Sequence, residues 1–168
     1  MRGSVVWLTV LAVASATVLG ALFVSGHLDD PGWVHVSNLG SLDRAKVLYL
    51  PSEKVFLVAN GSRPLALSAV SPHVGEPIFY CRSSGYFEDF VGGDKFNGLG
   101  DYALGPSPRG MDRVRLMVEG DEVLIQPNAI WNGPPRGTGK AMPPAGPFCT
   151  AGRNLIQSSP GFVRPPSS

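Results

Sequence analysis

The stretch Ser71–Gly110 reads SPHVGEPIFYCRSSGYFEDFVGGDKFNGLGDYALGPSPRG, and it decides the fold of this chain. It holds a Pro-His-Val-Gly segment around His73, a Gly-Gly-Asp-Lys-Phe-Asn segment at 92–97 and a Gly-Pro-Ser-Pro segment at 105–108. Glycine and proline punctuate turns, while the Ile, Phe and Tyr residues between them favour short strands. The stretch therefore predicts loops presented from a sheet, two of them covered by the third.

Strand patterns continue on both sides of this stretch. Runs rich in β-branched and aromatic residues precede it at 47–50, 54–60 and 64–70, and two more follow it at 113–118 and 122–127. Asn60-Gly61 and Glu119-Gly120-Asp121 separate neighbouring runs and favour tight hairpin turns, because glycine and asparagine tolerate positive φ. We therefore expect a small antiparallel, all-β domain over residues 46–128.

The composition excludes several classes of function. The net charge is +1 and only 16% of the residues are charged, which does not suit a phosphate-binding surface, so nucleic acid is not expected as a partner. Nucleophile-elbow, haem-attachment and zinc-protease motifs are all missing from the sequence. The two cysteines, Cys81 and Cys149, are too few for a disulfide-rich scaffold.

The N-terminal region predicts a membrane anchor. Residues 5–24 carry no charge and are long enough to cross a bilayer as a helix. A cleaved signal peptide with a small-residue site at Ala14-Ser15-Ala16 is the alternative. Arg2 before the segment places residues 1–4 in the cytoplasm and the globular part on the extracytoplasmic side of the cell membrane, as a single-pass protein. Residues 25–45 are interpreted as a linker.

The C-terminal region is rich in proline and glycine and has little periodicity. We expect an irregular extension at 129–155 lying over the domain, and a disordered tail at 156–168. In an oxidising compartment, Cys81 and Cys149 are expected to form a disulfide that ties this extension down.

The loops resemble those of Rieske iron–sulfur domain proteins of the membrane-anchored, actinobacterial type. That family's loops read Cys-x-His-Leu-Gly and Cys-x-x-His-Gly-Ser-x-Phe, followed by a Gly-Pro-x-Pro loop. The resemblance implies a small antiparallel β sandwich with a loop tip, preceded by one transmembrane helix. It also implies a 2Fe-2S cofactor held by two thiolates and two imidazoles. The proline loop here is Gly105, Pro106, Ser107 and Pro108.

The residues at the family's four ligand positions do not follow its pattern. His73 matches the first histidine, but Ser71 and Asp89 stand where the cysteines belong, and Gly92 replaces the second histidine. Hydroxyl and carboxylate oxygens are hard donors that suit sulfide-bridged iron poorly. Nearby Phe87, Phe90 and Phe96 are the apolar residues expected to fill the vacated space.

Three functions remain as hypotheses. The first is a membrane-anchored structural or interaction subunit, beside a respiratory or other membrane complex, with no cofactor and no enzymatic activity. The second is a working Rieske electron carrier of a quinol-oxidising complex, an oxidoreductase by family. The third is a mononuclear metal protein that uses His73 with carboxylates drawn from Glu76, Asp89 and Asp94, since these donors suit Zn²⁺ or Mn²⁺.

Overall fold

The computed structural model describes residues 32–149 of the chain. The expected membrane anchor at 5–24, the cytoplasmic residues 1–4 and the tail at 156–168 lie outside this part. Within residues 32–149, none of the helical segments has the length and apolar character that crossing a bilayer requires.

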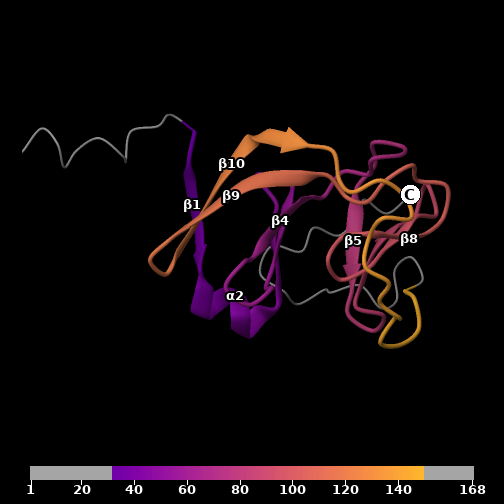
Figure 1. The fold of residues 1–168 in the computed structure, drawn as a ribbon, viewed down its shortest axis with the longest axis horizontal. Helices are drawn as coiled ribbons and strands as arrows, with labels where there is room; N and C mark the ends of the chain where they lie inside the picture. Colours follow the sequence, from indigo (N-terminus) through magenta and orange to yellow (C-terminus); the bar gives the residue numbers. More distant parts are fainter. Residues whose placement is uncertain (1–31, 150–168) are drawn as a thin grey trace, which may run out of the picture. The chain divides into compact units, whose positions relative to one another are not determined.

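The larger of two antiparallel sheets has six strands in the order β1-β10-β9-β4-β3-β2. Their bounds are Val34–Asn38 for β1, Val47–Leu50 for β2, Val55–Val58 for β3, Leu65–Ser68 for β4, Arg113–Glu119 for β9 and Glu122–Trp131 for β10. The expected hairpins are present: β3 pairs with β4, and β9 pairs with β10 around Gly120, which has a φ of 61°. Figure 1 shows β9 and β10 as the long paired strands of this sheet.

The smaller sheet has four strands in the order β5-β6-β7-β8 and carries the loops of interest. Its strands are Ile78–Cys81 (β5), Tyr86–Asp89 (β6), Lys95–Phe96 (β7) and Tyr102–Leu104 (β8). In the chain, its four strands come between β4 and β9 of the larger sheet. Figure 1 shows β5 and β8 apart from β1, β9 and β10. The all-β prediction is therefore confirmed, as two antiparallel sheets.

The interpretation of residues 25–45 as a linker is wrong for its described part. Strand β1 pairs with β10, and helix α2 (Leu39–Ala45) follows it directly. The Asn38 side chain accepts a hydrogen bond from the Ser41 N–H at 2.8 Å, which caps the helix, and Leu42 of the helix is buried. Strand β10 runs to Trp131, beyond the predicted end at Pro127.

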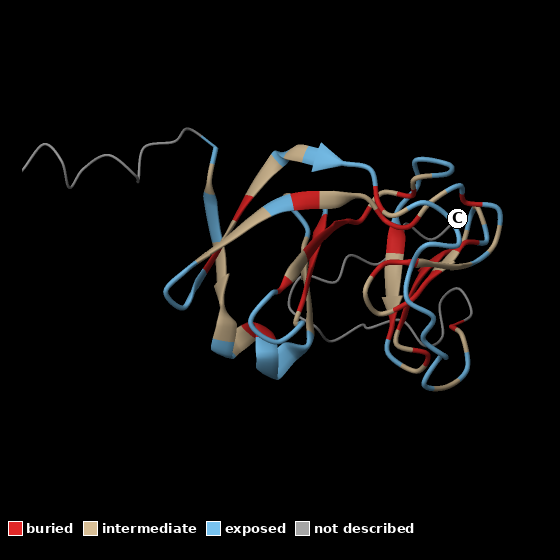
Figure 2. Ribbon diagram, viewed as in Figure 1, coloured by how far each residue is buried: buried red, intermediate tan, exposed pale blue. Residues whose placement is uncertain are grey.

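The core explains why the Val55–Val58 run is apolar without alternation. Side chains of successive strand residues point to opposite faces, and both faces of β3 are covered. Phe56 and Val58 pack in the core that joins the two sheets, whereas Val55 and Leu57 pack in a second core within the larger sheet. Figure 2 shows buried residues along β4 of the larger sheet and β5 of the smaller sheet. The first core further contains Leu67, Ala69, Ile78, Phe87, Phe96 and Met111.

A buried ion pair also joins the two sheets. Arg113 of β9 donates to the Leu99 carbonyl at 2.7 Å and to Asp101 Oδ1 at 3.0 Å, just before β8. Burial lowers the pKa of the Arg113 guanidinium, and the charge and hydrogen bond of Asp101 oppose that shift. The second oxygen of Asp101 accepts from the Lys140 N–H at 3.0 Å, so the same carboxylate holds the C-terminal extension.

The described part of the extension contacts the loops and the smaller sheet. Residues 132–149 form no further strand, but they are tied to the domain at intervals by hydrogen bonds from backbone and side chains. The Gly133 N–H donates to Asp112 at 3.0 Å, the Arg136 N–H to the Pro108 carbonyl at 3.1 Å, and the Ala145 N–H to the Ser84 carbonyl at 2.8 Å. The expected disulfide between Cys81 and Cys149 is present.

Candidate functional site

The first loop, between β4 and β5, is closed by its own backbone. The Ser71 N–H donates to the Glu76 carbonyl at 2.8 Å, and the Gly75 N–H donates to the Ser71 carbonyl at 3.0 Å. Gly75 has a φ of 76°, a conformation that glycine adopts without strain. The Ser71 hydroxyl is buried and accepts from the N–H groups of His73 and Val74, so it serves the turn of its own loop.

The second loop, between β6 and β7, is built around Asp89. Its Oδ1 accepts two hydrogen bonds of 2.8 Å, from the N–H groups of Val91 and Gly92. An aspartate side chain bonded in this way to the backbone just ahead of it stabilises a turn. Asp89 is fully buried, and its Oδ2 has no hydrogen-bond partner among residues 32–149.

The proline loop covers the second loop through Asp94. Asp94 is fully buried, and its Oδ1 accepts from the Ser107 N–H at 2.6 Å. The Tyr102 hydroxyl donates to the Gly105 carbonyl at 2.7 Å, and the Ser107 hydroxyl donates to the Arg109 carbonyl at 2.8 Å. The loop at 105–108 is thus fixed on a buried carboxylate.

His73, Asp89 and Asp94 each bring a polar atom close to Gly92. A Cβ built on Gly92 would lie 2.6 Å from Asp89 Oδ2 and 3.1 Å from both Asp94 Oδ2 and His73 Nδ1. His73 Nδ1 and Asp94 Oδ2 are themselves 3.1 Å apart. The His73 side chain is 33% exposed, so one edge of the site is open to solvent, whereas both aspartates are enclosed.

The structure therefore brings together three of the four predicted positions, His73, Asp89 and Gly92. Ser71 lies in the same loop as His73, but its hydroxyl is engaged by that loop's own N–H groups. Glu76, one of the carboxylates in the mononuclear hypothesis, is exposed and is not among the groups around Gly92. Asp94, which the same hypothesis also named, does lie near Gly92.

The donors present do not fit a 2Fe-2S cluster. Such a cluster needs two thiolates and two imidazoles, and these loops offer one imidazole and two carboxylates. The two cysteines are bonded to each other below the loops, and so cannot serve as thiolate ligands in this state. Cys81, Cys149 and Glu88 do gather their ligand atoms within 4.8 Å, but the sulfur atoms there form the disulfide.

A second buried charge lies beside that disulfide. Glu88 is fully buried and accepts from Ser84 at 3.0 Å, from the Cys149 N–H at 3.1 Å and from Lys95 Nζ at 2.9 Å. The Lys95 ammonium lies over two aromatic rings, 5.6 Å from the centre of Phe90 and 5.5 Å from that of Phe148. Sequence reasoning gave no role to this pair.

The expectation that Phe87, Phe90 and Phe96 fill the vacated cluster space is wrong. Phe87 and Phe96 lie in the core that joins the sheets, and Phe90 packs against Phe79 beside the disulfide. The space next to the loops is instead surrounded by polar groups, since Asp89, Asp94 and His73 approach Gly92.

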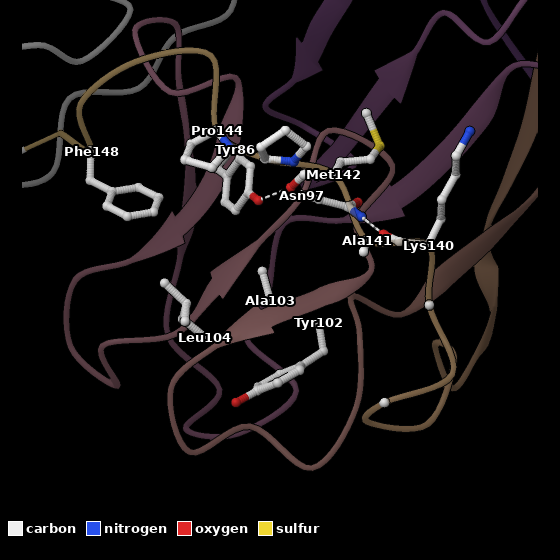
Figure 3. A pocket seen from close by; sticks show the side chains of 13 residues that line it. Tyr86, Asn97, Tyr102, Ala103, Leu104, Lys140, Ala141, Met142, Pro144 and Phe148 are labelled. Atoms are coloured by element: carbon white, nitrogen blue, oxygen red, sulfur yellow. Dashed lines mark hydrogen bonds between the residues drawn. The ribbon is translucent and has the colours of Figure 1, made fainter.

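An open groove of about 740 Å³ runs between β8 and the extension. Figure 3 shows Tyr102 and Leu104 on one side and Pro144 and Phe148 on the other. Tyr86 donates to the Met142 carbonyl, and Asn97 Nδ2 donates to the Lys140 carbonyl at 2.7 Å. These bonds fix the extension that forms one wall of the groove.

Comparison with known proteins gives a structural likeness and no sequence match. Neither a protein-family model nor a curated protein matches the chain. The chain resembles the plasma membrane Rieske protein PetC3 of the cyanobacterium Synechocystis PCC 6803, with 23% identity over 55% of this chain and 97% of that one, at a TM-score of 0.46. It also resembles a chain of a hyperthermophilic respiratory Complex III, with 19% identity over 69% of this chain and 97% of that one, at a TM-score of 0.35. Neither likeness says what this chain binds.

Proposed function

We propose that this chain is a membrane-anchored, Rieske-like domain that has lost its 2Fe-2S cluster and serves as a structural or interaction subunit outside the cytoplasm. A single observation carries the proposal. The loops keep their turns and their proline cover, while the side chains at the ligand positions are used for other contacts. A scaffold can persist after its original chemistry is lost, because folding and function depend on different residues.

Ser71 and Asp89 illustrate the change of role. Ser71 accepts hydrogen bonds from its own loop, and Asp89 Oδ1 holds the turn at Val91 and Gly92. Gly92 offers no side chain. These residues therefore stabilise the loops without iron. Electron transfer needs a redox centre. With these residues at the ligand positions, the chain is expected to act by binding a partner protein.

Exposed apolar residues on the two loops suit an interaction role. Val74 in the first loop is 40% exposed and Val91 in the second is 71% exposed. Apolar side chains at the tips of rigid loops provide contact area for a partner protein without disturbing the core. A partner within a respiratory or other membrane complex fits the proposed anchor at residues 5–24 and the extracytoplasmic location.

The full-length chain purified in detergent should be colourless. Because one imidazole and two carboxylates cannot hold sulfide-bridged iron, neither isolation nor incubation with ferrous iron and sulfide under anaerobic conditions should produce a visible absorption band. Spectroscopy together with iron and acid-labile sulfide analysis checks this. A stable band with two irons per chain would instead establish the electron-carrier hypothesis.

The anchor has its own test. The full-length chain should stay with the membrane fraction after extraction with alkaline carbonate, because an uncharged segment of this length is as long as the hydrocarbon core is thick. A variant that starts after residue 24 and carries a cleavable export signal should be released. Release by carbonate would contradict the anchor, and the mass of the released chain would distinguish cleavage of the segment from peripheral attachment.

A further inference from the structure

We propose that one end of the larger sheet, formed by the start of β1 and the end of β10, rests on the headgroup region of the bilayer that holds the anchor. The contact is made by Trp33, Val34, Ile130 and Trp131, and we call these four residues the apolar rim. The proposal rests on the anchor of the proposed function, and it adds a membrane surface to the contacts of the globular domain.

Three side chains of the apolar rim are large, apolar and exposed. Val34 is 39% exposed, Ile130 is 53% exposed and Trp131 is 52% exposed. Earlier in β10, Val123 and Ile125 are fully buried, so the strand changes from buried to exposed before it ends. A group of large exposed apolar side chains is typical of a surface that a protein or a membrane covers.

The pairing of the strands brings these residues to the same end of the sheet. β1 and β10 are antiparallel and Val34 pairs with Ile125, so β1 starts at the end of the sheet toward which β10 runs. On β9, Leu116 pairs with Ile125 and Arg113 pairs with Trp131. The two levels are therefore three residues of β9 apart, or about 10 Å, because a bulge takes up the intervening residues of β10. Figure 2 shows the start of β1 and the end of β10 as exposed.

Arg115 lies between the two tryptophans on one face of this sheet. Its guanidinium is 5.5 Å from the centre of the Trp33 ring and donates to Gln126 at 3.2 Å. Arg115 and Arg113 are two residues apart on β9 and point to the same face, on which Trp131 lies opposite Arg113. Tryptophan is enriched where a bilayer meets water, and an arginine beside it can keep its charge among the headgroups while its stem contacts apolar groups.

The length of the chain before β1 favours the bilayer as the surface that covers the apolar rim. Trp33 is nine residues after the uncharged segment at 5–24, and the chain enters the sheet at the rim itself. Nine residues span at most about 30 Å when fully extended, so an anchored chain keeps the rim within reach of its own membrane. Asp29 and Asp30 in this connection offset the charge of Arg115, so the apolar side chains would provide the binding.

Tryptophan fluorescence of the full-length chain in lipid vesicles tests the proposal. The chain has three tryptophans, Trp7, Trp33 and Trp131, so replacing two of them by phenylalanine leaves one reporter at a time. The vesicles contain lipids whose acyl chains are brominated near the headgroup, and these quench indoles that reach that depth. With Trp7→Phe and Trp33→Phe, the emission of Trp131 should fall by about half or more relative to unbrominated vesicles, as for an indole at the headgroup level.

Two further variants separate contact at the apolar rim from general closeness to the membrane. Glu119→Trp, with the three native tryptophans replaced by phenylalanine, is the matched control. Glu119 is exposed and lies on the same face of β9 as Arg113, about 20 Å along the strand, so this reporter should stay unquenched. Ile130→Asp puts a carboxylate beside Trp131 and should restore the emission of Trp131, because a charge is costly to bring next to acyl chains.

A chain that keeps Trp7 as its single tryptophan distinguishes failure of the anchor from failure of the contact. Trp7 belongs to the proposed anchor at 5–24, so its emission should fall in brominated vesicles whether or not the apolar rim binds. Quenched Trp7 with unquenched Trp131 would overturn the membrane contact and leave the anchor, whereas unquenched Trp7 would overturn both. Unquenched Trp131 emission at short wavelength would show that a partner protein or a second copy covers the rim, which also overturns the contact. Equal quenching of Glu119→Trp and Trp131 would overturn the assignment to the rim.

Discussion

Replacing Cys81 and Cys149 together by alanine should lower the free energy of unfolding by about 4 kcal/mol, the loop-entropy value for cysteines 68 residues apart. The bond closes a loop that contains β6, β7 and β8 of the smaller sheet, the proline loop and the hairpin of β9 and β10. Without it, the unfolded chain gains freedom, and residues 132–149 keep only their hydrogen bonds and packing contacts.

Denaturant unfolding of the wild type and the double variant measures this effect. The wild type treated with a reductant should fall to the stability of the double variant, and the variant itself should not respond to the reductant. In the reduced wild type and in the double variant, proteolysis should cut the extension first, because the extension has no strand of its own after Trp131. Equal stability of the oxidised wild type and the variant would show that the disulfide does not hold the extension.

Replacing Lys95 by methionine should destabilise the domain by about 3–5 kcal/mol, because it leaves the Glu88 carboxylate buried without its cation. Glu88 is fully buried and the Lys95 side chain is 18% exposed, so little solvent is available to screen the loss. The hydrogen bonds from Ser84 and the Cys149 N–H remain, but they are not a counter-charge.

A double variant distinguishes charge from packing in this experiment. Glu88→Gln combined with Lys95→Met removes both charges and should recover much of the lost stability, as neutral replacements of buried ion pairs often do. Lys46→Met is the matched control: its pair with Asp43 is about 70% exposed on both sides, so its loss should leave the stability nearly unchanged. If Lys95→Met behaves like this control, the buried pair contributes nothing beyond a surface contact.

The strands and the hairpins follow from local sequence, whereas the disulfide follows from there being only two cysteines to pair. Runs such as Val55–Val58 and turns such as Glu119-Gly120-Asp121 carry their structure in residues that are close together in the chain. Strand β1 and helix α2 cannot be predicted in this way. The segment Val34–Asn38 is too short and polar to indicate a strand by itself, and it forms one by pairing with β10. The strand therefore depends on a partner about ninety residues further along the chain, since Val34 pairs with Ile125.

The site shows the same division. The turns around His73 and at 92–94 were predictable from proline and glycine, and so was the cover formed by Pro106 and Pro108. The burial of Asp89, Asp94 and Glu88 was not, because charged residues are mostly exposed and nothing local marks the exceptions. Asp94 is enclosed by the proline loop thirteen residues later, a contact that requires both loops to be placed first.

Metal analysis and a visible spectrum of the full-length chain, purified after exposure to iron and sulfide, test the central claim that these loops keep their turns and proline cover without an iron–sulfur cluster. The account predicts no visible absorption band, no stoichiometric iron and no acid-labile sulfide. Two irons and two sulfides per chain, with the band they produce, would contradict it.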